Sequence, residues 1–194
     1  MGAPRYQAAF EALQARLSTG AVEHCQRVSQ TAAELAQTYG APVESARLAG
    51  LLHDWDRETG HEQLRSVACE AGIELTATDE AVPYLLHART GALRVAETFP
   101  DLGADVLHAI ASHTVGAGQM SALDRVVYIA DMIEPGRDFP GLDELREAVG
   151  VITLDELYAS CYQRSLLHLI ERRRPLHPRT VDAWNALVSG GRDD

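Results

Sequence analysis

The segment LLHDWDRE, residues 51–58, constrains this chain most, because it places two polar side chains where an apolar helix face is expected. Residues 48–52 read as the buried face of a helix, and His53 and Asp54 follow at its end. An isolated buried carboxylate costs many kcal/mol unless its charge is compensated. A hydrogen-bond network, a cationic side chain or a metal ion must therefore accompany Asp54.

The rest of the chain predicts a succession of helices. Apolar residues recur at helical spacing from Val28 to Tyr39, and Gly40 ends that pattern. Pro42 fits the first turn of the helix that leads to His53. Further helices are expected over residues 92–99, 106–113, 121–133 (with Ser121 and Asp124 as a capping box), 154–174 and 180–188, the last with Val181, Trp184, Leu187 and Val188 on one face. No segment shows convincing strand alternation, so we expect an all-α fold.

The length of 194 residues suits one well-buried domain. Apolar residues make up 46% of the chain and charged residues 23%, which is ordinary for a soluble globular protein. We expect residues 1–19 to form an N-terminal helical extension, residues 20–188 a single helical bundle, and residues 189–194 a frayed tail.

Several features argue for the cytoplasm. No run of about 18 apolar residues predicts a membrane span, and the N-terminus lacks the apolar segment of a signal peptide. The three cysteines, Cys25, Cys69 and Cys161, are widely spaced and odd in number. They suit small core side chains in a reducing compartment better than a disulfide framework or a zinc knuckle.

The net charge of −11 argues against binding to a nucleic-acid polymer, which depends on clustered Lys and Arg. It does not exclude a small phosphorylated substrate, because a metal ion and a few arginines can reverse the sign of one pocket.

Polar side chains interrupt the apolar faces of five predicted helices. A lone histidine on such a face is more often a core residue with satisfied hydrogen bonds than a ligand. Six ligand-type residues together change that balance, because neutral imidazole and carboxylate suit Fe, Mn, Co or Zn. The six are His24, His53, Asp54, His87, His113 and Asp131. We therefore predict that a metal ion compensates Asp54.

The order H…HD…H…H…D resembles the six-ligand pattern of dinuclear HD-domain metal-dependent phosphohydrolases. Two longer segments, ELAQTYGAPVESARLAGLLHDWDRE (34–58) and SHTVGAGQMSALDRVVYIADMIEPGRDFPGLDELRE (112–147), resemble the YqeK-type symmetrical bis(5′-nucleosyl)-tetraphosphatases. The motif ADMIEPGR at this distance after SHT is the most specific part of the resemblance. The similarity extends over about residues 20–188, which implies that this segment is an HD domain.

The resemblance implies a metal site and catalytic residues. His24, His53, Asp54 and Asp131 would hold the tightly bound metal, most often iron, with Mn, Co or Mg as alternatives. His87 and His113 would ligate a second metal or contact phosphate. The resemblance therefore leaves open whether the site holds one metal ion or two. The residues expected to take part in catalysis are His53, Asp54, His87, His113 and Asp131.

The resemblance also implies phosphate contacts from Arg57, His87, His113, Thr114 and Arg137, and it places the segment RPLHPRT, residues 174–180, near the nucleotide. A guanidinium suits bidentate contact with phosphate. Two positions depart from the pattern, because Ala21 stands where relatives often have Arg and Arg57 where they often have Lys. Glu134 either supports a ligand or only ends its helix.

The implied activity is hydrolysis of diadenosine tetraphosphate to two ADP, by attack of hydroxide generated at the metal on phosphorus. Two alternatives stay open. One is an HD phosphohydrolase for a mononucleotide, a dNTP or a guanosine polyphosphate, and the other is a nucleotide-binding module without turnover. The expected partners are a small dinucleoside polyphosphate and its ADP product, and we also consider a homodimer.

Overall fold

The structure, a computed structural model, describes residues 2–189, and side chains from residue 5 onward. Within this range the chain forms eleven α-helices, one short 3₁₀ helix and no strand, so the all-α prediction is confirmed. In chain order the helices are α1 (Gly2–Gln14), α2 (Thr19–Tyr39), α3 (Val43–Leu52), α4 (His61–Glu70), α5 (Ala77–Ala81), η1 (Pro83–Leu86), α6 (His87–Thr98), α7 (Ala104–Ser112), α8 (Ala122–Ile133), α9 (Leu142–Glu147), α10 (Leu154–Glu171) and α11 (Pro178–Ser189).

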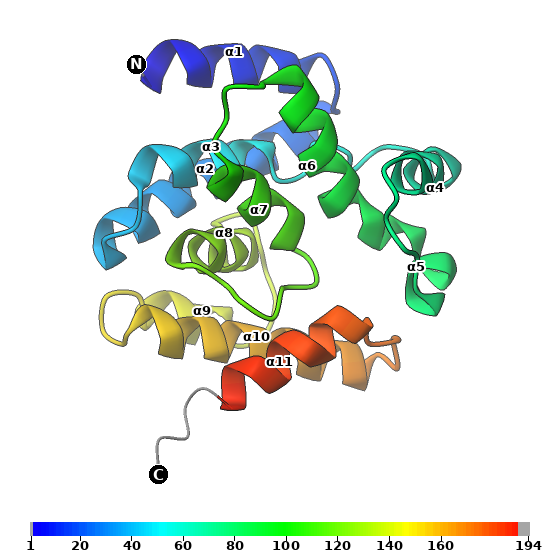
Figure 1. The fold of residues 1–194 in the computed structure, drawn as a ribbon. Helices are drawn as coiled ribbons and strands as arrows, with labels where there is room; N and C mark the ends of the chain where they lie inside the picture. The colour runs from blue at the N-terminus through cyan, green and yellow to red at the C-terminus, as the bar shows by residue number, and fades with distance from the viewer. Residues whose placement is uncertain (1, 190–194) are drawn as a thin grey trace.

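Helices α2, α3, α7 and α8 form the centre of the bundle, with α8 seen nearly end-on in the middle of Figure 1. Their apolar faces meet in one core that includes Val28, Leu51, Ile110 and Val127. Helix α1 lies across the top of this view and buries Ala9 and Leu13 in the same core. Helix α1 is thus packed onto the bundle, while the domain boundaries at residues 20 and 188 stay a prediction.

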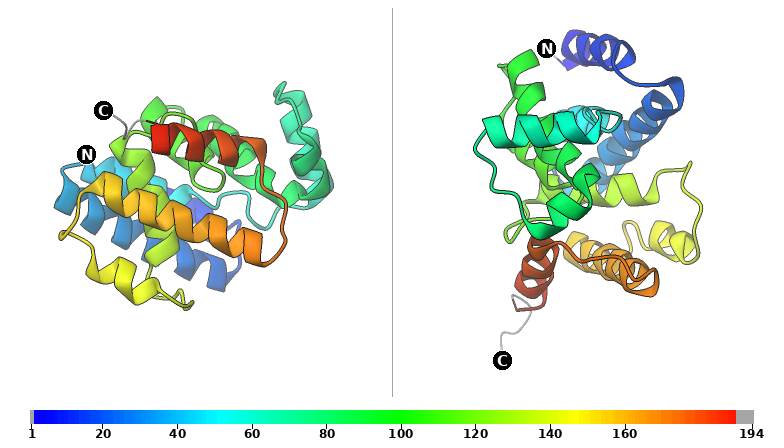
Figure 2. Two further views of the ribbon diagram at one scale, coloured as in Figure 1. Left: turned by 90° about the horizontal axis from the view of Figure 1, so that it is seen from below. Right: turned by 90° about the vertical axis from the view of Figure 1, so that its right-hand side faces the viewer.

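Two further groups of helices flank the centre. Helices α4 and α5 lie at the right of Figure 1 with a small core of their own around Leu64 and Leu86. Helices α10 and α11 run side by side below the centre, as the left view of Figure 2 shows. The hydroxyl of Tyr162 on α10 lies 2.8 Å from the carbonyl oxygen of Val115 and 3.1 Å from that of Thr180 on α11, and it shares its one proton between them. This contact fastens both helices to the segment after α7.

Several helix ends follow the expected local chemistry. Gly40 ends α2 in the left-handed conformation with φ of 73°, which glycine adopts without steric cost. Ser121 and Asp124 form the predicted capping box of α8. Pro42 is the N-cap of α3 rather than a residue of its first turn, so its predicted position is wrong by one residue.

Four further features differ from the sequence-based expectations. The sequence-based expectations did not include α4, α5, η1 and α9. The last three have six residues or fewer. For α4 the helical spacing of Leu64, Val67 and Ala68 was the available signal. Helix α11 buries Thr180 and Ala183, whereas Val181 and Val188 are exposed, because Thr180 turns inward to donate to the carbonyl of Val115. Cys25 and Cys161 are buried free thiols as expected, but Cys69 is exposed. The predicted tail at 189–194 begins with the last residue of α11, and residues 190–194 lie outside the described residues.

The close approach of α2 and α3 depends on Gly50. A Cβ at this position would lie 3.0 Å from the Cα of Ser29 and 3.0 Å from the carbonyl oxygen of Val28, both in the backbone of α2. A Cβ contact this short is tighter than nine in ten real ones, and the neighbouring atoms are backbone, so glycine lets the end of α3 lie against α2. This contact brings His53 close to His24.

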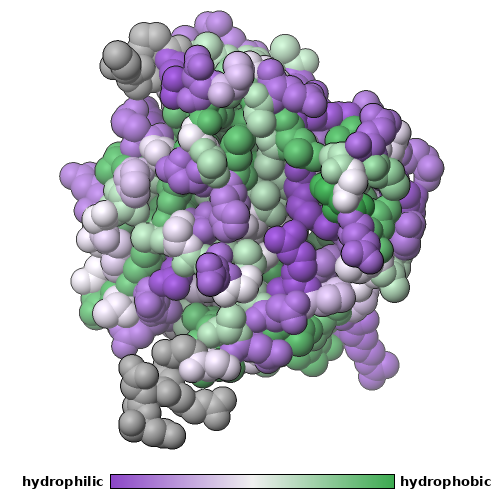
Figure 3. Space-filling view, viewed as in Figure 1, coloured by the Kyte–Doolittle hydropathy of each residue, from purple (hydrophilic) through white to green (hydrophobic). Residues whose placement is uncertain are grey.

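The surface is mixed in character. In Figure 3 hydrophilic and hydrophobic residues alternate over the face in view, and hydrophilic ones gather between the central helices and α4. No helix among residues 2–189 combines the length and the apolar composition needed to cross a membrane.

Candidate metal centre and phosphate cavity

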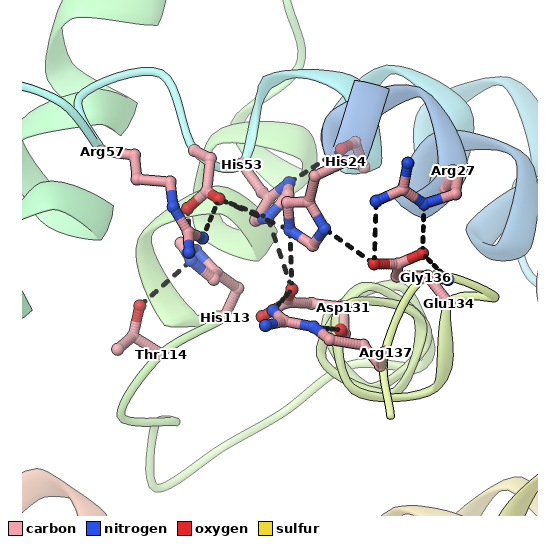
Figure 4. A network of polar contacts seen from close by, with 12 residues as sticks. His24, Arg27, His53, Arg57, His113, Thr114, Asp131, Glu134, Gly136 and Arg137 are labelled. Atoms are coloured by element: carbon pink, nitrogen blue, oxygen red, sulfur yellow. Dashed lines mark hydrogen bonds and ion pairs between the residues drawn. The ribbon is translucent and has the colours of Figure 1, made fainter. Parts of the chain in front are cut away.

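All six predicted ligand residues converge at one place between the central helices. Each arrives from the end or the inner face of a helix, and the helices are the five that the sequence predicted. The residues are His24 in α2, His53 and Asp54 directly after α3, His87 at the start of α6, His113 directly after α7, and Asp131 in α8. Figure 4 shows most of this cluster, with the imidazoles of His24 and His53 directed towards Asp131 and that of His113 joined to Thr114.

Backbone carbonyls orient three of the four imidazoles. In each of these residues Nδ1 lies close to the carbonyl oxygen of the residue three positions earlier. The distances are 2.8 Å for His53, 2.6 Å for His87 and 2.7 Å for His113. A carbonyl only accepts, so each Nδ1 must carry the ring proton and donate it. Each Nε2 atom is then left with a lone pair directed at the centre, which is the tautomer a metal ligand needs.

A carboxylate orients the fourth imidazole. Nδ1 of His24 lies 3.0 Å from Oε1 of Glu134, which is itself buried. Arg27 donates through Nε to Oε2 of Glu134 at 2.6 Å, and the backbone N–H of Gly136 donates to the same oxygen. Burial raises the pKa of the Glu134 carboxyl, but these hydrogen bonds lower it by more than burial raises it. The pKa of Glu134 is therefore below its usual value. Glu134 is therefore an anion that supports His24 (Figure 4).

Four ligand atoms stand close together on one side of the cluster. Nε2 of His24 lies 3.0 Å from Oδ1 of Asp131 and 3.5 Å from Oδ2 of Asp54. Nε2 of His53 lies 3.2 Å from the same oxygen of Asp54 and 3.7 Å from that of Asp131. Atoms bonded to one transition-metal ion at about 2.1 Å stand roughly 3.0–3.5 Å from one another, so this spacing fits a shared ion.

Asp54 faces a second group with its other oxygen. Oδ1 of Asp54 lies 3.2 Å from Nε2 of His87 and 3.6 Å from Nε2 of His113. The two Nε2 atoms are 3.2 Å apart. Since Nδ1 holds the ring proton in both residues, two lone pairs face each other at this distance and would repel unless a cation lies between them. A metal ion or a shared proton supplies such a charge.

The buried polar atoms support the same interpretation. Nε2 of His24, Nε2 of His53 and Oδ1 of Asp54 are buried and make no hydrogen bond within the described residues. Arg57 pairs with Oδ2 of Asp54, so one oxygen of this buried carboxylate has a cationic partner and Oδ1 has none in the described part of the chain. A metal ion would satisfy these unpaired buried atoms, and the donor set fits a divalent transition metal.

Cys25 also comes within ligand distance of His53 and Asp54, which the sequence reading did not anticipate. Burial raises the pKa of its thiol well above the usual value, with a further contribution from the Asp54 charge. A thiol that holds its proton is a poor ligand. The His/Asp set therefore remains the better candidate.

A cavity of about 610 Å³ opens beside the cluster. It is lined by Asp54, His87, His113 and Asp131, and also by the phosphate-contact candidates Arg57, Thr114 and Arg137. Arg57 pairs with Oδ2 of Asp54, Arg137 pairs with Asp131, and the hydroxyl of Thr114 lies 3.1 Å from Nε2 of His113. Two guanidinium groups thus border a space next to the ligand cluster, which suits a phosphate chain.

The segment 174–180 does not line this cavity. Its His177 is buried, and Nε2 of His177 lies 3.2 Å from Oδ2 of Asp79 in α5. Ala21 is also absent from the lining and packs on the hydrophobic core. Arg172, Arg173 and Arg174 are exposed.

The structure adds residues that the sequence reading did not select. Tyr84 lines the cavity, with its ring centroid 4.6 Å from that of His87. Arg27 acts on the site through Glu134, and its position three residues after His24 on the same helix was the available signal. A third set of lining residues comes from α8, the segment before α9, and α10: Tyr128, Met132, Phe139, Pro140, Arg164, Ser165, Leu167, His168 and Glu171.

Comparison with known proteins agrees with this geometry. Residues 21–136 match the HD domain family. A symmetrical bis(5′-nucleosyl)-tetraphosphatase of Bacillus subtilis is 33% identical, over 86% of this chain and 89% of the relative. One of the same name from Halalkalibacterium halodurans is 32% identical, over 93% of this chain and 95% of the relative.

A solved structure is also similar. It is a predicted HD superfamily hydrolase involved in NAD metabolism from Clostridium acetobutylicum, with a TM-score of 0.89 and 34% identity, covering 95% of this chain and 97% of that chain. Family match, sequence identity and fold thus agree over most of the chain. This protein belongs to the HD-domain hydrolases, and among them to the family of the symmetrical bis(5′-nucleosyl)-tetraphosphatases.

Proposed function

We propose that this protein hydrolyses diadenosine tetraphosphate in the middle of its phosphate chain and releases two ADP molecules. The observation that carries the proposal is the convergence of six His and Asp side chains beside a cavity bordered by Arg57 and Arg137. The names of the relatives support the same substrate class.

His24, His53, Asp54 and Asp131 would hold a divalent metal ion. Iron is our first choice, with Mn and Co as alternatives, because imidazole and carboxylate ligands without thiolate suit such ions. Mg is a further alternative, although it prefers oxygen ligands to imidazole. A bound ion of this kind lowers the pKa of a water molecule to near neutrality and polarises a phosphoryl oxygen. His87 and His113, with Oδ1 of Asp54, would hold a second ion or contact phosphate directly.

The remaining side chains would act on the phosphates. Negative charge grows on the non-bridging oxygens during displacement at phosphorus. Arg57 and Arg137 would neutralise this charge through N–H groups, and Thr114 would donate its hydroxyl proton to a phosphate oxygen. Such fixed donors stabilise the transition state without having to reorganise.

The facing Nε2 atoms of His87 and His113 give the site a place for a proton. In the presence of a single metal ion, a proton held between these two atoms would satisfy both lone pairs. From Nε2 of His113 it would pass to the oxygen of the departing ADP. In the presence of two ions this position would be occupied by the second ion, so the number of ions decides which role the pair has.

The test is a comparison of substrates with metal-loaded protein. We expect the highest kcat/KM for diadenosine tetraphosphate, with ADP as its only nucleotide product, against AMP, dGTP and ppGpp. A higher kcat/KM for one of the other three would show a different phosphohydrolase. Tight ADP binding without hydrolysis of any of the four, in the presence of Fe, Mn, Co or Mg, would show a binding module instead.

A cytoplasmic location and a homodimeric state stay predictions. The buried free thiols of Cys25 and Cys161 support a reducing compartment. Size-exclusion chromatography with light scattering would measure the oligomeric state, and a monomer at micromolar concentration would contradict the dimer.

A further inference from the structure

The cavity extends beyond the His/Asp cluster along one side of α10. That part is lined by Arg164, Ser165, Leu167, His168 and Glu171. Positions 164, 165, 168 and 171 follow helical spacing and therefore share one face of α10. The distance from residue 164 to residue 171 along the helix axis is about 10 Å, which is a length that a nucleoside can cover.

The two halves of α10 are packed differently. Its first half buries Leu157, Tyr158, Cys161 and Tyr162 in the core. Residues 163–171 include no buried side chain, and Leu167 is 46% exposed. The second half of α10 is thus a partly open wall of the cavity, so its side chains are accessible to a ligand.

Arg164 is held in place at this wall. Its Nη1 donates to the carbonyl oxygen of Pro140 at 2.9 Å. Its guanidinium group lies against Gly141, which has φ of 83° and no side chain that would occupy the same space. Among the described residues Arg164 makes this one hydrogen bond, so its further N–H groups can donate into the cavity that it lines.

The wall combines the two kinds of surface that a purine nucleoside requires. Leu167, Phe139 and Met132 offer apolar contact for a flat ring. Ser165, His168 and Glu171 offer donors and acceptors for the ring edge and the ribose hydroxyls. None of these residues belongs to the cluster that would hold the metal.

Symmetrical cleavage requires space in two directions. The bond that is broken lies in the middle of the phosphate chain, so an equal arm of two phosphates and one nucleoside extends to each side of the metal centre. An arm directed along the cavity from His113 would place its nucleoside against α10. Contact with that nucleoside would set the register of the phosphate chain and so select the central bond.

We propose that the face of α10 formed by Arg164, Leu167 and His168 binds one of the two nucleosides of the dinucleoside tetraphosphate. This inference rests on the proposed function, because it assigns a part of the same substrate. It makes α10 a specificity element for substrates with a nucleoside at each end.

Adenosine 5′-tetraphosphate provides the test, because it has four phosphates but only one nucleoside. In the Arg164→Ala/Leu167→Ala double variant we expect kcat/KM for diadenosine tetraphosphate to fall about 10- to 100-fold, the range for a lost pocket contact. For adenosine tetraphosphate it should change less than about threefold, since its single nucleoside can occupy the other arm's site. Metal content should be unchanged.

Ile170→Ala is the matched control, because Ile170 is an exposed apolar residue in the same half of α10 and does not line the cavity. The Ile170→Ala variant should have the same kcat/KM as wild type for both substrates. If circular dichroism shows that the double variant does not fold, the same measurements are made on His168→Ala instead.

An equal loss for both substrates, or no loss for either, would overturn the assignment of α10. Failure of the wild-type protein to cleave diadenosine tetraphosphate would instead refute the proposed function itself. The two failures are therefore distinguishable.

Discussion

Glu134 accepts a hydrogen bond from Nδ1 of His24 at 3.0 Å and thereby directs Nε2 of that imidazole at Asp131, 3.0 Å away. Arg27 and the N–H of Gly136 hold the carboxylate in its turn. A carboxylate behind a ligating histidine fixes its tautomer and raises its basicity. The motif ADMIEPGR thus contributes three functional groups, with Asp131 at the centre, Glu134 behind His24, and Arg137 beside the cavity.

Replacing Glu134 with Gln keeps the shape of the side chain but removes its charge. We expect metal affinity to fall by about 10- to 100-fold, measured by competition with a chelator. Glu97→Gln is the control, because Glu97 is exposed on α6. Equal metal affinity in the two variants would show that Glu134 only ends its helix.

Arg137→Ala should separate phosphate binding from metal binding. The loss of a charge-assisted contact of roughly 1.5–3 kcal/mol should lower kcat/KM by about 10- to 150-fold, with metal content intact. Arg137→Lys should recover only part of the lost kcat/KM, because an ammonium group cannot make the forked contact. An Arg137→Ala enzyme with unchanged kinetics on diadenosine tetraphosphate would place the phosphate site elsewhere.

Gly50→Ala should disturb both fold and site. Its Cβ would meet the backbone of α2 at Val28 and Ser29, and the carbonyl of Gly50 orients His53. We expect a loss of about 1–3 kcal/mol in the free energy of unfolding, measured by urea denaturation of metal-free protein. Gly20→Ala in the first turn of α2 meets no atom within 4 Å and should be neutral or stabilising. Equal stability of the two variants would refute the close-packing argument.

Asp79 should make stability depend on pH. It is fully buried, accepts hydrogen bonds from Thr76, and pairs with Arg89 and His177. Burial raises its pKa, but the Thr76 hydrogen bonds and the Arg89 charge lower it more, so the pKa in the folded protein lies below the unfolded value of about 3.9. Its contribution is therefore complete well above pH 4 and is lost as pH falls through the folded-state pKa.

Asp79→Asn should accordingly be less stable than wild type by about 1–3 kcal/mol at pH 7. The difference should shrink below about pH 4. Urea unfolding at several pH values measures it, with exposed Asp101→Asn as the control. A difference that stays constant down to the lowest pH at which the protein folds would show that the charge of Asp79 contributes nothing.

Much of the His/Asp cluster was predictable because its polar residues stand at helix positions where apolar residues are expected. His24, His53 and Asp131 each interrupt an apolar helix face, which local packing alone does not explain. Gly40 and the capping box of α8 were predictable because their chemistry is local. In each of these cases a few neighbouring residues determine the outcome.

The remaining features depend on contacts between distant segments. The buried face of α11 is set by the hydrogen bond from Thr180 to Val115, which no local pattern shows. Leu167 is 46% exposed and lines the cavity, because the second half of α10 buries no side chain among the described residues, and no local pattern shows this. Helix α9 has only six residues, too few for a period to be recognised.

We propose that water attacks the middle of the phosphate chain at the His/Asp cluster. Hydrolysis of diadenosine tetraphosphate in ¹⁸O-labelled water, with mass analysis of the nucleotides after a single turnover of metal-loaded protein, tests it most directly. If water attacks one of the two central phosphorus atoms, ADP is the only nucleotide product. One of the two ADP molecules then has one labelled oxygen in its terminal phosphate. Formation of ATP and AMP, or label found only in AMP or ATP, would contradict it.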